Sequence, residues 1–70
     1  MSDKTLKKIA DNVRKARSAS GLTQLELAKK AGLSTNYISR IERADVSPTV
    51  ETLEKLAKAL RIKSSDILPF

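Results

Sequence analysis

The chain has 70 residues, is basic and has few aromatic side chains, and this composition excludes several kinds of chemistry. It contains no cysteine and no histidine, so it lacks a thiol nucleophile, disulfides, the usual zinc ligands and the commonest general base. A domain of this size is also too small for a deep ligand pocket. We therefore expect no catalytic residue, no metal, no cofactor and no small-molecule ligand.

The excess positive charge lies in the first part of the chain. The formal net charge is +6; residues 1–43 carry ten Lys and Arg against four Asp and Glu, whereas residues 44–70 carry four of each. A basic surface on one part of a small domain is typical of proteins that contact phosphate groups, although lysine-rich helices are also common as plain solvent-exposed helices. No apolar run approaches the ~20 residues of a membrane span, so no membrane contact is expected.

The first predicted helix has Ser2 or Asp3 as its N-terminal cap and runs to about Ser20. Its apolar residues recur at helical spacing: Leu6, Ile9, Ala10, Val13 and Ala16. Gly21 is a natural stop for this helix. Arg17 continues the apolar stripe toward the core, where an unpaired guanidinium group would be very costly.

Two short helices joined by a tight turn are predicted at about 23–43. Thr23 and Glu26 have the spacing of a capping box, in which each side chain accepts from the backbone N–H of the other residue. The first of these helices ends at Gly32, because glycine adopts the left-handed conformation without a Cβ penalty. Ser34 can cap the second helix. This arrangement predicts a helix-turn-helix.

The second of these helices has two different faces. When residues are placed at about 100° per step, Ile38 and Ile41 lie almost opposite a polar arc. The polar arc contains Thr35, Asn36, Ser39, Arg40 and Arg43. Surface helices commonly show this division, so the two faces alone do not establish what the arc contacts.

The C-terminal helices are predicted at about 49–68. Thr49 can cap the fourth helix. The apolar stripe of that helix contains Val50, Leu53, Leu56, Ala57 and Leu60. A short fifth helix is expected to start near Ser64, to continue through Ile67 and Leu68, and to be stopped by the following proline. The expected fold is therefore all-α, a compact five-helix bundle containing a helix-turn-helix, in a single domain over the whole chain.

The segment TNYISRIER, at 35–43, resembles the phage repressor and Cro type of helix-turn-helix, most closely the small controller proteins of restriction–modification systems. The same resemblance is carried by the spacing of Gln24, Ala28, Gly32, Ile38 and Ile41. It extends over most of the chain, from about Val13 to Leu68. It implies a sequence-specific transcriptional regulator that binds double-stranded DNA as a homodimer at an inverted-repeat operator, in the bacterial cytoplasm. For an activator, RNA polymerase would be a further partner.

The resemblance places the helix from Thr35 in the major groove of DNA. The expected contacts to bases are Thr35, Asn36, Ser39 and Arg40. Arg40 can donate two hydrogen bonds to guanine O6 and N7, and Asn36 can pair with an adenine edge. The expected contacts to the DNA backbone are Gln24, Tyr37, Arg43 and Arg14, of which Gln24 follows from the resemblance alone. For Tyr37, packing with its hydroxyl on a phosphate and pure core packing are equal alternatives.

The resemblance also gives Arg17 a partner. An arginine at this position pairs, in this family, with a glutamate at the position of Glu42, which helical geometry places between the core seam and the groove face. We therefore expect Arg17 and Glu42 to form a structural ion pair. The alternative is that Arg17 lies on the surface.

Two positions depart from the family pattern. Ala44 and Arg61 stand where glycine is common after the third and fourth helices, and a left-handed conformation there would cost about 1 kcal/mol at each. Alternatively, Asp45 adopts the left-handed conformation after the third helix in place of Ala44, since Asp tolerates that conformation. Asp45 and Val46 also occupy loop positions where basic residues are frequent, which argues against phosphate contacts from this loop.

The C-terminal end provides the expected dimer interface: Ile62, Ile67, Leu68 and Phe70. Alternatively, Ile67 and Leu68 only close the core of the monomer. A second class of function, a helical protein-interaction adaptor, would require an exposed apolar patch, which the polar arc does not offer. An antitoxin-like partner is compatible with DNA binding. An enzyme is a third class and lacks the side chains that catalysis most often uses.

Overall fold

The computed structural model describes residues 3–69, and every regular element in this range is helical. The elements are α1 (Asp3–Ala19), α2 (Gln24–Ala31), α3 (Thr35–Glu42), α4 (Val50–Leu60) and the 3-10 turn η1 (Ser64–Asp66). The all-α prediction is confirmed for these residues, and α2 and α3 form the helix-turn-helix. Ser2 and Phe70, predicted as a helix cap and a dimer contact, lie outside the described residues. No helix in this range combines the length and apolar character needed to cross a membrane.

The prediction of a fifth α-helix is wrong, because the segment after α4 contains only the three-residue turn η1. The amide of Ile67 donates to the Ser64 carbonyl at 3.0 Å, which is the hydrogen bond of a 3-10 turn. Pro69 has no N–H to donate and disfavours the α conformation at Leu68. The turn therefore cannot continue as an α-helix.

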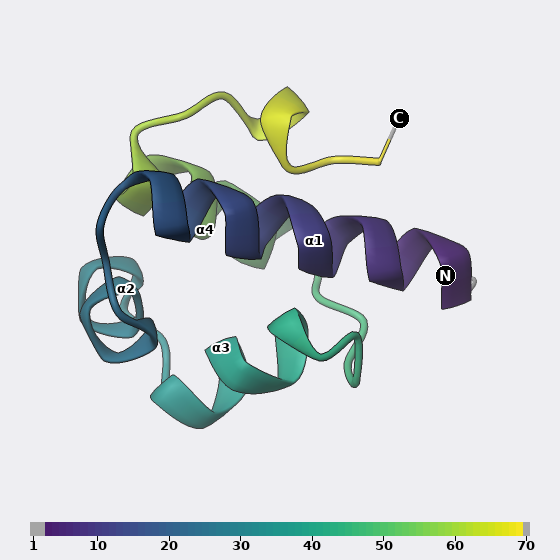
Figure 1. The fold of residues 1–70 in the computed structure, drawn as a ribbon, viewed down its shortest axis with the longest axis horizontal. Helices are drawn as coiled ribbons and strands as arrows, with labels where there is room; N and C mark the ends of the chain where they lie inside the picture. Colours follow the sequence, from purple (N-terminus) through teal and green to yellow (C-terminus); the bar gives the residue numbers. More distant parts are fainter. Residues whose placement is uncertain (1–2, 70) are drawn as a thin grey trace.

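The longest helix, α1, crosses the molecule, with α3 below it and α4 behind it in Figure 1. One end of the fold is closed by α2, which contacts both α3 and α4. The C-terminal segment returns along α1, where Asn12 Nδ2 donates to the Ile67 carbonyl at 3.0 Å. On its inner side α3 contacts α1 and α2, and it forms the lower edge of the molecule in Figure 1.

The core is aliphatic and draws side chains from all four α-helices. Its largest fully buried residues are Ile9, Val13, Leu27, Ile38, Ile41, Leu53, Leu56 and Ile67. Burying a side chain of this kind stabilises a fold by about 1.5–3 kcal/mol relative to leaving it exposed. Ile67 has 0% of its surface exposed, which corrects the expectation that it lies in a dimer interface; it closes the monomer core instead. Leu68 and Ile62 are half-buried against the same core.

Local side-chain bonds define where the helices of the motif begin. The capping box predicted at the start of α2 is present: the Thr23 hydroxyl accepts from the Glu26 amide at 3.1 Å, and the Glu26 carboxylate accepts from the Thr23 amide at 2.9 Å. The hydrogen bond that the Glu26 carboxylate accepts from the Thr23 amide lowers the pKa of Glu26 below its ordinary value. Ser34 caps α3 by accepting from the Tyr37 amide at 3.1 Å. Thr49 caps α4 in the same way.

Each of the four α-helices in residues 3–69 is followed by a residue in the left-handed conformation. The φ angles are 72° at Gly21, 70° at Gly32, 59° at Ala44 and 57° at Arg61. After α3, the Ala44 amide donates to the Ile41 carbonyl at 3.0 Å and the Asp45 amide to the Arg40 carbonyl at 2.9 Å. This pair of bonds defines a Schellman motif. Ala44, and not Asp45, therefore carries the left-handed turn, contrary to the alternative considered from the sequence.

Candidate nucleic-acid interface

α3 turns a polar face away from the core. Ile38 and Ile41 are buried on its inner side. The predicted base contacts, Thr35, Asn36, Ser39 and Arg40, all lie outside the buried set. Asn36 and Arg40 are exposed, whereas the two shorter side chains are half-buried. The helix therefore offers a polar surface whose position is fixed by an apolar anchor on the opposite side.

A three-residue turn fixes the start of α3 against α2. Gly32 adopts the left-handed conformation, and the Leu33 amide then donates to the Ala28 carbonyl at 2.9 Å. Ala28 is buried, and its small side chain permits the close approach that a steep crossing of two helices requires. Ser34 caps α3 directly after this turn. Hydrogen bonds on both sides of the turn thus limit how far α3 can move.

A hydrogen-bonded ion pair joins the end of α3 to α1. Arg17 Nε donates to Glu42 Oε2 at 2.7 Å, and its Nη2 donates to Oε1 at 3.0 Å. The third guanidinium nitrogen, Nη1, donates to the Leu22 carbonyl at 2.9 Å. The side chains are 17% and 4% exposed, respectively. The hydrogen bond to Glu42 raises the pKa of Arg17, while burial acts against it. The structure thus contains the ion pair that the resemblance implies.

Two further side chains reach Glu42, and sequence reasoning did not identify either contact. Gln24 Nε2 donates to Glu42 Oε1 at 3.1 Å. Arg14 Nη1 donates to the Glu42 carbonyl at 3.1 Å, and its Nη2 pairs with Asp11. Gln24 and Arg14 are both predicted DNA backbone contacts, yet each has a structural partner within the chain. No sequence signal could have shown these bonds, because they depend on how α1 and α2 pack around the end of α3.

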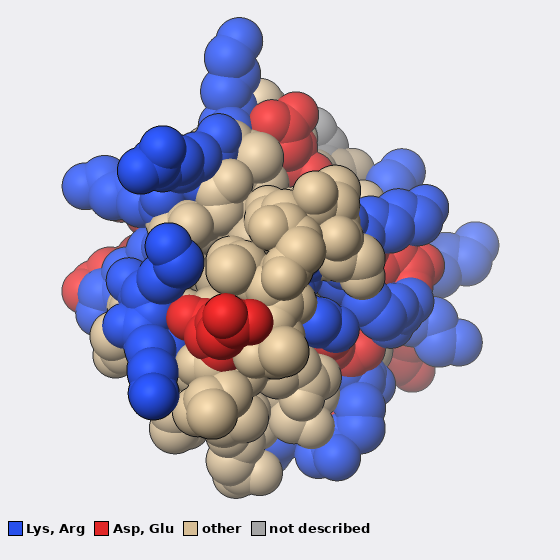
Figure 2. All heavy atoms as spheres, turned by 60° about the vertical axis from the view of Figure 1, so that its left-hand side comes forward, with Lys and Arg blue, Asp and Glu red and all other residues tan. Residues whose placement is uncertain are grey.

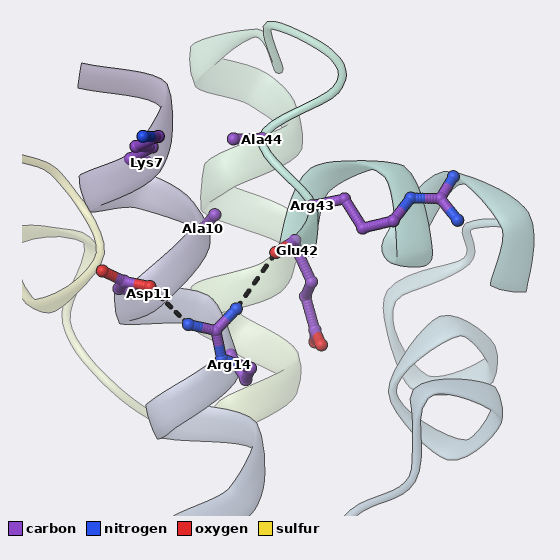
Figure 3. Close-up of a pocket in the computed structure, with 7 residues that line it drawn as sticks. All are labelled: Lys7, Ala10, Asp11, Arg14, Glu42, Arg43 and Ala44. Carbon is purple, nitrogen blue, oxygen red and sulfur yellow. Dashed lines mark hydrogen bonds and ion pairs between the residues drawn. The ribbon is translucent and has the colours of Figure 1, made fainter. Parts of the chain in front are cut away.

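An open hollow of about 450 Å³ lies between α1 and the end of α3 (Figure 3). Lys7, Arg14 and Arg43 are among its lining residues. The Arg14 guanidinium lies between Asp11 and the Glu42 carbonyl, whereas the Arg43 side chain extends away from α1. Since Arg14 is bound to Asp11 and to the Glu42 carbonyl, and Arg43 points elsewhere, we assign no ligand to the hollow.

Both arginines at the end of α3 face the same carboxylate. Arg40 Nε lies 3.8 Å from Asp45 Oδ2, and Arg43 Nη2 lies 3.9 Å from the same oxygen. These distances exceed those of N–H···O hydrogen bonds, about 2.7–3.2 Å, so the arginines keep their donors. Exposed ion pairs of this kind contribute little to stability. Their importance lies in the charge that they place on this surface.

Basic side chains also gather on a larger scale at the end of the molecule that contains α2. Figure 2 shows the molecule with the end that contains α2 turned forward. Lys and Arg side chains flank a broad uncharged surface on both sides, and a small acidic patch lies within it. A surface with this distribution attracts polyanions at long range, while its uncharged centre can approach a ligand closely.

The α2–turn–α3 unit and its polar outer face define a helix-turn-helix domain. Residues 13–67 match the family model described as helix-turn-helix (HTH_3), and the chain belongs to this family of transcriptional regulators. The resemblance to phage repressors and controller proteins is therefore confirmed.

Named relatives support the same assignment. The chain is 40% identical over 60 residues to the immunity repressor protein of Bacillus phage phi105, covering 86% of this chain and 42% of that protein. It is also 40% identical over 60 residues to the control protein C.SmaI of Serratia marcescens. That match covers 86% of this chain and 71% of the controller protein. The chain thus spans less than half of the phage repressor and more than two thirds of the controller protein.

A solved structure agrees in fold over nearly its whole length. The restriction–modification controller protein C.AhdI from Aeromonas hydrophila superposes with a TM-score of 0.87 at 33% identity. The match covers 90% of this chain and 96% of that one. The position of the helix-turn-helix within a small helical domain is therefore shared with a controller protein.

Proposed function

We propose that this chain is a sequence-specific regulator that inserts α3 into the major groove of double-stranded DNA. The observation that carries the proposal is the division of α3, where Ile38 and Ile41 are held in the core while a polar arc faces solvent. The major groove of B-DNA admits an α-helix and shows a distinct pattern of donors and acceptors at each base pair. The polar arc has the side chains that such a pattern requires.

Arg40 is the proposed guanine contact. Its side chain is 45% exposed, and its planar fork can donate to guanine O6 and N7 together. Asn36, one turn earlier and also exposed, can pair with an adenine edge. The shorter Thr35 and Ser39 can meet base edges or a thymine methyl group at close approach.

The proposed contacts to the DNA backbone are Arg43, Gln24, Tyr37 and Arg14. Arg43 is 62% exposed and extends away from α1. The amide nitrogen of Gln24 carries two hydrogens, so it can keep its bond to Glu42 and donate the second hydrogen to a phosphate. Such a phosphate contact would be made by a side chain that the fold already orients.

The regulator is proposed to act in the cytoplasm as a homodimer on an inverted-repeat operator. The eight residues of α3 rise about 12 Å, which is the height of only three or four base pairs. One subunit therefore reads too little sequence for a unique genomic target. A two-fold dimer with recognition helices about 34 Å apart would read two half-sites one helical turn apart. The named controller proteins favour a role in controlling restriction–modification genes.

A selection experiment tests the proposal. The purified chain is used to enrich duplexes from a pool with a random central region, and the best duplex is then titrated beside a scrambled version of itself. We expect the enriched duplex to bind at least about 1000-fold more tightly at physiological salt, the lower end for specific regulators. If no duplex binds better than random sequence, the proposal fails and the adaptor or antitoxin-like alternative gains support.

A further inference from the structure

We infer that Asp45 is a positioning residue for the base contact of Arg40, an assignment that rests on the proposed function. One oxygen of the Asp45 carboxylate lies 3.8 Å from Arg40 Nε and 3.9 Å from Arg43 Nη2. A single negative charge therefore stands between two arginines of the proposed DNA surface, at a loop position where it would be expected to repel phosphates.

The backbone, rather than a chance surface contact, places Asp45 beside Arg40. The Asp45 amide donates to the Arg40 carbonyl at 2.9 Å, and this bond requires the left-handed turn at Ala44. The fold accepts the unfavourable conformation of a non-glycine residue to make this turn. As a result, the residue five positions after Arg40 is returned to the same end of α3.

The approach of the carboxylate leaves the recognition edge of Arg40 open. Asp45 is nearest to Nε, so the terminal nitrogens Nη1 and Nη2 can donate to the two acceptors of guanine. The negative charge also offsets the repulsion between Arg40 and Arg43, which lie three residues apart on the helix surface. The attraction between the two charges would favour Arg40 conformations near the end of α3, so Arg40 would lose less side-chain freedom on binding.

The same charge lowers the affinity for DNA of arbitrary sequence. Non-specific binding rests almost entirely on phosphate electrostatics. The negative charge of Asp45 partly offsets the positive charge of Arg43 and repels phosphates nearby. At the operator, the oriented Arg40 recovers part of this loss through its bond to guanine. Asp45 would thus raise the ratio of operator affinity to non-specific affinity.

The experiment replaces Asp45 by asparagine, which has the same shape and no charge. The wild-type chain and Asp45→Asn are titrated with the enriched duplex and with its scrambled version at two salt concentrations. We expect the scrambled duplex to bind more tightly, and the operator-to-scrambled ratio to fall about threefold to fivefold, the scale of one exposed ion pair. In an Arg40→Ala background, Asp45→Asn should leave the ratio unchanged.

Glu54→Gln is the matched control, because it makes the same change of charge at an exposed carboxylate on α4. It should leave the ratio at the wild-type value. The inference is overturned if Asp45→Asn leaves the ratio unchanged, or lowers it equally with and without Arg40. If the wild-type chain prefers no duplex over random sequence, the proposed function is overturned as well. If the wild-type chain prefers the enriched duplex and Asp45→Asn has the same operator-to-scrambled ratio, this inference alone is overturned.

Discussion

Glu42 is the side chain on which three helices converge. Its carboxylate accepts from Arg17 of α1 and Gln24 of α2, while Glu42 itself belongs to α3. Its side chain is only 4% exposed. A buried ion pair of this kind holds its helices in register chiefly because each partner is costly to leave alone. The orientation of the proposed recognition helix therefore depends on a few specific hydrogen bonds as well as on apolar packing.

Replacing Glu42 by alanine should lower the free energy of unfolding by about 3 kcal/mol, since the change leaves the Arg17 guanidinium buried without its counter-charge. Arg17→Ala should have a similar effect for the same reason. Urea unfolding followed by circular dichroism measures both changes. Lys15→Ala, at an exposed position of the same helix, is the control and should stay within about 0.5 kcal/mol. Losses below about 0.5 kcal/mol for both pair variants would show that the pair contributes no more than a surface contact.

Single residues show where sequence reasoning succeeds and where it stops. The position of Arg17 in an apolar stripe shows that it needs a partner, and the family resemblance supplies Glu42. The bonds from Gln24 and Arg14 to Glu42 could not be predicted, because helical periodicity gives the face of a residue but not the distance between helices. The approach of Asp45 to Arg40 was also hidden, since it depends on which residue carries the left-handed turn.

At the scale of elements, local signals place the helix limits well. The capping residues and the glycines after α1 and α2 act within one helical turn, so they can be recognised without knowledge of the fold. The C-terminal segment was mispredicted because a short apolar run does not distinguish a helix from a single turn packed on a core. Ile67 was assigned to a dimer interface for a similar reason, since the sequence does not show which apolar residues the monomer already covers.

Two helix ends carry avoidable strain. Ala44 and Arg61 have φ angles of 59° and 57°, a region that costs non-glycine residues about 1–2 kcal/mol. Ala44→Gly and Arg61→Gly should each raise the free energy of unfolding by about 0.5–1 kcal/mol, after the greater flexibility of glycine in the unfolded chain is subtracted. Thermal unfolding of each variant measures the gain.

Ala59→Gly is the control for these two variants, because Ala59 lies within α4, before the left-handed residue that follows the helix. This variant should lose about 1 kcal/mol, the usual difference between alanine and glycine in a helix. If all three glycine variants are destabilised alike, the left-handed turns at Ala44 and Arg61 are not strained in solution.

At the scale of the whole molecule, the described chain measures 28 × 23 × 20 Å and presents one proposed recognition helix. We predict that two chains associate symmetrically through the C-terminal end. Leu68 and Ile62 are half-buried and pack against the core, so they keep some surface for a partner, and the proposed interface also includes Phe70. Ile67 supports this end of the fold from within.

Analytical ultracentrifugation at micromolar concentration measures this assembly. The wild-type chain should sediment as a dimer, and Leu68→Asp or deletion of Phe70 should weaken the association. Lys63→Asp, at an exposed position of the same segment, is a control for added negative charge that removes no apolar surface. A wild-type chain that stays monomeric both alone and on its enriched duplex would refute the dimer.

The central claim is that α3 reads bases through Arg40 while neighbouring groups hold the phosphates. Base contacts carry sequence information, whereas phosphate contacts mainly fix position and affinity. Arg40→Ala should therefore weaken binding to the enriched duplex by about 1–3 kcal/mol, with a much smaller effect on scrambled DNA. Arg43→Ala should weaken both duplexes by similar factors and reduce the slope of log affinity against log salt by about one per subunit.

The most direct measurement is the titration of wild type, Arg40→Ala and Arg43→Ala against the enriched and scrambled duplexes at several salt concentrations. The account predicts that the ratio of the two affinities falls at least about fivefold for Arg40→Ala and stays near the wild-type value for Arg43→Ala. A ratio that is unchanged in Arg40→Ala would contradict the account, because it would mean that this side of α3 does not read bases.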